Sequence, residues 1–155
     1  MIGVMNIRRY IRNIGGSTVL LEKAKKVRKI ADFICPDKII DFHISEYKKK
    51  TGERVFQSLF LFSERFQLES KNIMSADVNM DITFHKSFID YYEITSSAYD
   101  FSKSATDEST LKIEGAMGNM SFELKATGRN CENLWDILTK YIKPNMYIGS
   151  KTEEE

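Results

Sequence analysis

The stretch ENLWDILTKYIKP, residues 132–144, holds the only tryptophan of the chain and has the hydrophobic period of a helix. Five apolar residues recur in it at the three- and four-residue spacing of one helical face: Leu134, Ile137, Leu138, Tyr141 and Ile142. Asn130 stands where the N-cap would lie, and Pro144 follows the last apolar position. The stretch therefore predicts a short C-terminal helix whose apolar face is widened by Trp135.

The residues before this helix have the two-residue period of β-strands. In IIDFHISEY, residues 39–47, apolar side chains alternate with polar ones, and the polar face that includes His43 is expected to face solvent. Six further runs have strand character: VFQSLFLF (55–62), RFQLES (65–70), DVNMDITFH (77–85), FIDYYEITSSAYDF (88–101), TLKIEGAM (110–117) and MSFELKAT (120–127). Gly118 and Asn119 suit a tight hairpin turn between the last two runs. Such antiparallel meanders favour a small barrel or sandwich.

We expect the C-terminal helix to cover one open end of these strands. A small antiparallel barrel leaves an apolar mouth that its own strands do not close, and an amphipathic helix buries that surface. Trp135 should then be largely buried against strand residues such as Phe60, Phe62 or Phe122.

Two helical patterns precede the strands and are separated by Gly15–Ser17. Each has one apolar stripe, formed by Val4, Ile7, Ile11 and Ile14 in the first and by Leu20, Ala24, Val27, Ala31 and Ile34, widened by Ile30 and Phe33, in the second. Ser17 or Thr18 can cap the second helix, and Pro36 ends it because the residue before a proline disfavours helical geometry. Each helix is too short to be stable alone, so its stripe needs a surface to pack on.

The chain thus divides into amphipathic helices at residues 1–35, a β-rich domain at 36–145 and a flexible acidic tail at 146–155.

The charge of the chain is distributed unevenly along the sequence. Residues 1–50 carry twelve Lys and Arg and five Asp and Glu, a net charge of +7, whereas residues 51–155 carry eleven and seventeen, a net charge of −6. Such segregation is typical of contact with an anionic surface, although basic residues also serve simply to solvate the outer faces of helices.

About seven short strands in two meanders, followed by one helix bearing a tryptophan, resemble the pleckstrin homology superfold. The segment SLFLFSERFQLES, residues 58–70, is similar to the strand-turn-strand of GRAM and bacterial pleckstrin-like domains. The resemblance covers roughly residues 36–143. It implies an α+β fold in which a small antiparallel pleckstrin-like β-barrel or sandwich is capped by the C-terminal helix, with the two N-terminal helices outside it.

In the lipid-binding branch of this family, Lys and Arg of the first two strands and their loop hold inositol phosphates. The loop portion is matched by four residues here: Lys48, Lys49, Lys50 and Arg54. A second arginine on the second strand is missing, and bidentate phosphate recognition is what arginine supplies and lysine does not. With further cations from Arg8, Arg9 and Arg12 of the first helix, we expect at most weak, salt-sensitive lipid binding. A solvated lysine-rich turn is the alternative.

No motif for catalysis is present. There is no GxSxG, Walker A or GxGxxG pattern, and His43 and His85 lack partners at metal-ligand spacing. Cys35 and Cys131 stand far apart in the sequence and form no CxxC pair. We expect both to remain reduced thiols in an intracellular protein. We therefore expect no metal, no cofactor, no catalytic residue and no enzymatic activity. No apolar run approaches the roughly 20 residues of a membrane span, so we expect a cytoplasmic protein, at most peripheral to a membrane.

The leading hypothesis is a non-enzymatic binding or scaffold module that uses its N-terminal helices for contact with a protein partner or for self-association. The residues expected to make this contact are Ile7, Ile11, Ile14, Leu20, Val27 and Ile34. The alternative is a peripheral membrane adaptor that binds anionic lipid through the basic helix and the lysine loop. Nucleic acid is not the expected partner, because the β-rich part is acidic. Whether the helices pack on each other, on the β-domain or on another molecule stays open, and we expect the β-domain to fold without them.

Overall fold

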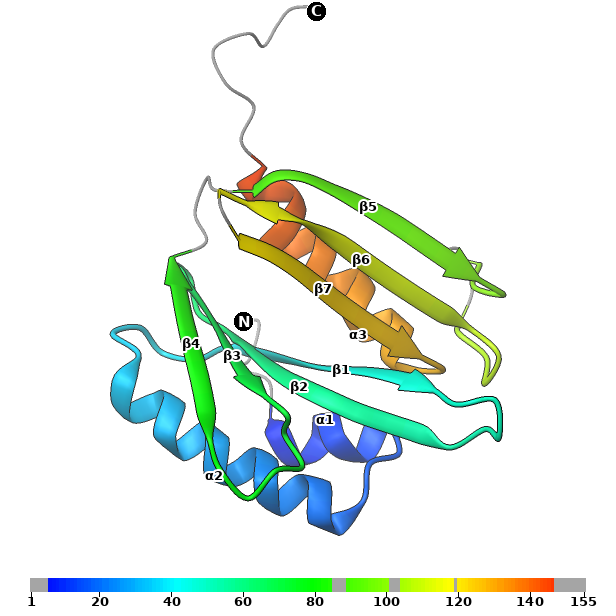
Figure 1. Ribbon diagram of the computed structural model, residues 1–155, viewed down its shortest axis with the longest axis horizontal. Coiled ribbons are helices and arrows are strands. Elements are labelled where there is room, and N and C mark those ends of the chain that lie inside the picture. Colours follow the sequence, from blue (N-terminus) through cyan, green and yellow to red (C-terminus); the bar gives the residue numbers. More distant parts are fainter. Residues whose placement is uncertain (1–5, 85–88, 101–103, 119, 147–155) are drawn as a thin grey trace, which may run out of the picture.

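The computed structural model describes residues 6–84, 89–100, 104–118 and 120–146, and its elements agree closely with those predicted (Figure 1). They are α1 (Ile7–Asn13), α2 (Thr18–Ile34), β1 (Asp41–Lys48), β2 (Arg54–Phe62), β3 (Phe66–Lys71), β4 (Asn79–Phe84), β5 (Ile89–Ser97), β6 (Thr110–Met117), β7 (Met120–Thr127) and α3 (Asn130–Ile137). The last helix continues through a π-helical turn, Leu138–Ile142, and a 3₁₀ turn, Lys143–Asn145. The fold is α+β, as expected, with two N-terminal helices and one C-terminal helix.

The strands form two antiparallel sheets, one in the order β1-β2-β3-β4 and the other in the order β5-β6-β7. In the described residues the sheets are not closed into a barrel, so the barrel expectation was wrong. β1 and β7 lie side by side, and side-chain hydrogen bonds connect them in place of a backbone hydrogen-bond ladder. Ser45 Oγ accepts from the Lys125 amide at 2.9 Å, and His43 Nε2 donates to the Lys125 carbonyl at 3.0 Å.

The two N-terminal helices pack as a layer on one face of the first sheet (Figure 1). Ser17 accepts from the Leu20 amide at 3.1 Å, which confirms it as the N-cap of α2, and the helix ends at Ile34, two residues before Pro36. In the described residues, no helix is both long enough and apolar enough to cross a bilayer.

The apolar stripes of α1 and α2 lie in the core of their own chain. Five residues expected to meet a partner are no more than 8% exposed: Ile7, Ile11, Ile14, Leu20 and Val27. They share one cluster with sheet residues that include Phe42, Ile44, Leu59, Leu61 and Leu68. We had left three surfaces open on which these helices could pack, and in the structure they pack on the β-domain. Residues 7–35, which we had placed in a separate domain, therefore share one hydrophobic core with the first sheet.

The C-terminal end of α2 departs from the predicted stripe. Ile34 is 46% exposed and Phe33 is 91% exposed, so the expectation that Phe33 widens the buried face was wrong. Phe33 follows the buried Ala31 by two residues, which is about 200° around a helix, and this turns its side chain to the outer face.

A second core lies between the two sheets and is built on α3. All five apolar residues predicted for the inner face of this helix are buried: Leu134, Ile137, Leu138, Tyr141 and Ile142. Tyr141 stacks on Phe62 of β2, with ring centroids 4.7 Å apart. Trp135 packs on this cluster, which contains Phe60, Phe62 and Phe122 as predicted, but its side chain is only partly buried.

The polar face of β1 is buried, against expectation. His43 is 0% exposed and Asp41 is 5% exposed, because β1 lies between the helical layer on one side and α3 with β7 on the other. Asp41 accepts from the Tyr141 hydroxyl at 3.0 Å. His85, for which we expected no metal-binding role, and residues 147–155 of the predicted tail lie outside the described residues.

Candidate functional site

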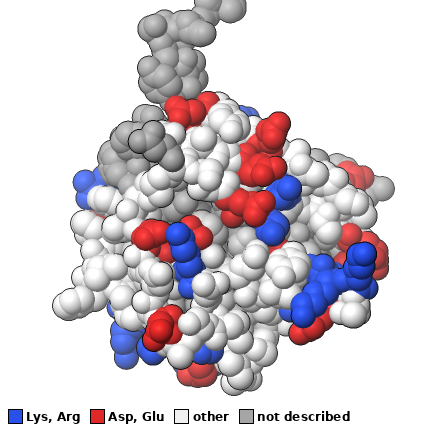
Figure 2. All heavy atoms as spheres, viewed as in Figure 1, with Lys and Arg blue, Asp and Glu red and all other residues white. Residues whose placement is uncertain are grey.

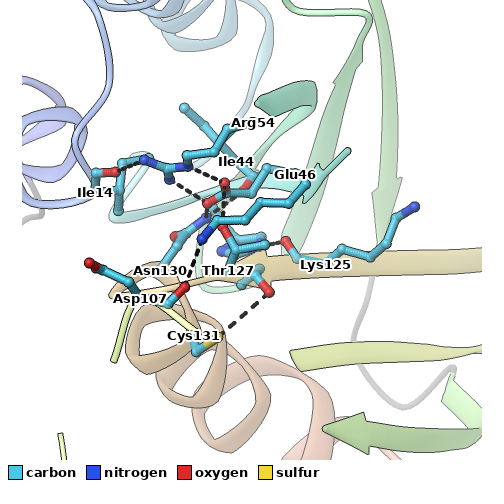
Figure 3. A network of polar contacts seen from close by, with 12 residues as sticks. Ile14, Ile44, Glu46, Arg54, Asp107, Lys125, Thr127, Asn130 and Cys131 are labelled. Atoms are coloured by element: carbon cyan, nitrogen blue, oxygen red, sulfur yellow. Dashed lines mark hydrogen bonds and ion pairs between the residues drawn. The ribbon is translucent and has the colours of Figure 1, made fainter. Parts of the chain in front are cut away.

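A buried carboxylate, Glu46 of β1, organises the region where β1, β2, β7 and α3 meet (Figure 3). A bulge between Ser45 and Glu46 turns this side chain into the core, where it is 0% exposed. Arg54 donates from Nε to Oε1 and from Nη2 to Oε2, both at 2.7 Å. Thr127 Oγ1 donates to Oε1 at 2.9 Å, and Asn130 Nδ2 donates to Oε2 at 2.7 Å. Four donors use the full acceptor capacity of the carboxylate.

Two side chains join this network to the free edge of β1. Tyr10 of α1 accepts from the Ile44 amide at 2.7 Å and donates to Asn130 Oδ1 at 2.8 Å. Asn130 also donates to the Ile44 carbonyl at 2.8 Å. Asn130 was predicted to be the N-cap of the last helix, and this was wrong. The cap position is held by Arg129 without a side-chain bond, because Asn130 is directed to the edge of β1.

Beside the network lies a cleft of about 230 Å³, between the α1–α2 turn, the β1–β2 hairpin and the junction of β7 with α3. Its charged lining residues are Arg12, Lys48, Arg54, Arg129 and Asp107. Four cations and one carboxylate from distant parts of the sequence thus surround one hollow, which we name the cationic cleft. Gly15 has φ +74°, and a Cβ there would lie 3.2 Å from Arg54 Nη1, so a glycine lets the turn come close to Arg54.

The cations of the cationic cleft differ in how far they are already used. Arg54 is bound to Glu46 and also donates to the Ile14 carbonyl, so these hydrogen bonds hold its guanidinium group in place. Lys48 donates to the Asp107 carbonyl at 2.7 Å. Arg12 and Arg129 are exposed, and neither has an ion-pair partner among the described residues. The cleft therefore offers two uncommitted guanidinium groups, beside an arginine whose charge is balanced by Glu46.

The other basic residues predicted for anion binding lie outside the cleft. Arg8 and Arg9 are exposed on α1, and Lys50 is exposed in the β1–β2 turn. Lys49 pairs with Glu53 across the same turn, with Nζ 3.4 Å from Oε1. The lysine loop thus contributes Lys48 to the cleft, while the rest of it stays in solvent.

Sequence reasoning missed Arg129 and the network around Glu46. A signal for Glu46 was present, since this carboxylate interrupts the strict alternation of β1 beside Ser45. No local signal exists for Arg129, because only the packing of α3 against β1 places it in the same cleft as Arg12.

Two buried groups near this network, Cys131 and His43, have strongly shifted pKa values. Burial raises the pKa of the Cys131 thiol to about 12, and the charges of Glu46 and Glu132 act in the same direction, so the thiol stays protonated near neutral pH. Burial lowers the pKa of His43 to about 4. Among the described residues, no three His, Cys, Asp or Glu side chains are grouped so that they could hold a metal ion.

Comparison of the chain with protein-family models, curated proteins and solved structures finds no match. The function of the site has to follow from its own geometry and charge.

Proposed function

We propose that the protein is a non-enzymatic binding module of pleckstrin-like architecture that recognises an anionic group in the cationic cleft. The observation that carries this proposal is the pair of exposed arginines, Arg12 and Arg129, that face one hollow without a carboxylate partner among the described residues. Guanidinium groups present paired donors that match phosphate and carboxylate oxygens, so the ligand class is a phosphate or carboxylate group.

The order of elements supports the pleckstrin-like assignment. A four-stranded meander, a three-stranded meander and one helix packed between the two sheets follow each other along the chain. This is the order implied by the resemblance of residues 36–143, and the two N-terminal helices add a layer outside it.

The cleft gives the module a contact surface different from the one first expected. The apolar stripes of α1 and α2 already pack on the sheet, so a protein partner would meet the outer surface of the fold. At the cationic cleft such a partner would present an acidic or phosphorylated side chain. Because Arg12 and Arg129 are exposed, binding should be modest and should weaken as salt increases.

Calorimetric titration of the full chain with inorganic phosphate tests this proposal, and acetate serves as the carboxylate probe. We expect saturable binding of one of these anions, weakened about tenfold or more in the variant Arg12→Ala/Arg129→Ala, because two charge-assisted donors are lost. The matched control is Arg8→Ala/Arg9→Ala, which removes two exposed arginines of α1 that do not line the cleft.

Equal weakening by both double variants would show general charge attraction and would contradict a site. Heat signals that do not saturate for either anion would do the same.

A further inference from the structure

The layer of α1 and α2 has a net positive charge, whereas the rest of the chain has a net negative charge. Residues 7–34 contain eight Lys and Arg and two Asp and Glu, a net charge of +6, and all ten side chains are exposed or partly exposed. Both acids have a local partner: Glu22 pairs with Lys25 at 4.0 Å, and Asp32 pairs with Arg28 at 3.1 Å. The rest of the chain has a net charge of −5.

Negative charge gathers on the other side of the first sheet, over β5, β6 and β7 (Figure 2). Glu93, Glu114 and Glu123 lie directly opposite one another across these strands. Lys112 and Lys125 relieve part of the repulsion, with Nζ 3.5 Å from Glu114 and 3.6 Å from Glu123. The molecule is therefore charge-polarised, with its basic side on the helical layer.

The outer face of α2 also carries an exposed aromatic residue. Phe33, at 91%, is the most exposed large apolar side chain among the described residues, and Ile34 beside it is 46% exposed. Lys29 and Lys26 precede Phe33 by four and seven residues, so all three share one helical face, and both lysines are exposed. The apolar face of α2 is already packed in the core, so this row of two lysines and one aromatic residue is what the helix offers to an outside surface.

We propose that the outer face of α2 docks on an anionic lipid surface, with Lys26 and Lys29 over the headgroups and Phe33 inserted between them. The lysines gain attraction to negatively charged lipid, and Phe33 leaves water only if the partner has an apolar interior. A bilayer supplies both over a continuous surface. On a second copy, the acidic row lies beside the exposed Tyr91, so that occupant is an outcome of the test. This docking uses residues outside the cationic cleft and stands independently of the anion site.

Flotation of the full chain with vesicles tests this docking. One set is phosphatidylcholine alone, and the other is an equal mixture of phosphatidylcholine and phosphatidylserine. We expect flotation only with the mixture, and less of it at high salt. Phe33→Ala should lower the partition coefficient about tenfold, and Lys26→Gln/Lys29→Gln about 30-fold. Because these side chains are exposed, the variants should keep the melting temperature of the parent protein.

Two matched controls accompany the assay. Tyr91→Ala removes an aromatic residue that is 57% exposed on the acidic side, and it should leave flotation unchanged. Lys143→Gln removes an exposed lysine that lies neither on α2 nor in the cationic cleft, and it should also leave flotation unchanged. The anion site is tested separately, with soluble phosphate and without vesicles.

The docking is overturned by absence of flotation with the phosphatidylserine mixture, or by equal flotation of the Phe33→Ala variant. It is also overturned if light scattering without vesicles shows a dimer that Phe33→Ala dissociates, since a second copy would then be the occupant of this face.

Discussion

At the scale of single residues, the polar side chains of β1 connect the two halves of the core. His43 has both ring nitrogens engaged, with Nε2 donating to the Lys125 carbonyl and Nδ1 accepting from Asn133 Nδ2 at 3.1 Å. This pattern fits only the neutral imidazole, because a proton on Nδ1 would face the amide donor. Burial acts in the same direction and lowers the pKa of His43 to about 4.

His43 should therefore make the protein less stable in mild acid. Unfolded His43 takes up a proton near pH 6.5, whereas folded His43 does so only near pH 4. Its contribution to stability is complete above pH 6.5 and is lost as the pH falls from 6.5 toward 4. We expect the free energy of unfolding to fall by about 2 kcal/mol between pH 6.5 and 5 through this residue. Denaturant titrations of the parent protein and of His43→Gln measure it as the difference in pH slope, and identical slopes would contradict the assignment.

The carboxylate of Glu46 should be the most costly single charge to remove. Glu46→Ala leaves Arg54, Thr127 and Asn130 without their acceptor in a buried region, and we expect a loss of about 3–5 kcal/mol in the free energy of unfolding. The matched control is Glu53→Ala in the same hairpin, where the exposed pair with Lys49 should contribute at most about 1 kcal/mol.

Chemical denaturation of the double variant Glu46→Ala/Arg54→Ala completes a cycle. We expect it to be more stable than the sum of the two single losses, because removing both partners leaves no uncompensated charge. Additive losses would show that Glu46 and Arg54 act independently.

At the scale of elements, most of the fold could be predicted because each helix and strand has its own hydrophobic period. The inner faces of α2 and α3 were predicted from spacing alone, and Leu20, Val27, Leu134 and Ile137 are buried as expected. Spacing specifies which residues share a face. It does not specify whether one face of a strand or both faces are covered by other elements. For this reason the polar face of β1, which includes His43, was predicted to face solvent.

The same limit explains the errors in the site. Lys48 and Arg54 were predicted as anion-binding residues from their positions in a basic hairpin, and both line the cleft. The sequence could not show that Arg54 is bound to a buried glutamate eight residues before it, or that Arg129 lines the same cleft as Arg12. Both facts depend on the packing of α3 and α1 against the edge of β1, which no local pattern encodes.

At the scale of the whole molecule, the N-terminal helices belong to the same hydrophobic core as the first sheet. Without α1 and α2, sheet residues that are now 0% exposed, including Phe42, Leu59 and Leu68, would meet water. Tyr10 would also leave the edge of β1. These contacts reverse our first expectation that the β-domain folds alone. We now expect residues 35–155 to lose cooperative thermal unfolding, measured by circular dichroism, whereas a fragment that melts cooperatively near the temperature of the full chain would contradict this.

The basic helical layer and the acidic second sheet give the molecule two sides, and the cationic cleft lies at one end of the basic side. An anionic ligand would thus be attracted toward the helical layer before it meets the arginines. The same polarity would orient the protein on an anionic surface, so anion recognition and docking of α2 would favour the same orientation.

A nuclear magnetic resonance titration of the full chain with inorganic phosphate, at constant ionic strength, shows whether the cationic cleft is an anion site. We expect saturable shift changes confined to the backbone amides that border the cleft: Arg12 to Gly15, Lys48, and Thr127 to Arg129. Shift changes spread over every lysine-rich segment, or none at the cleft up to millimolar phosphate, would contradict the claim.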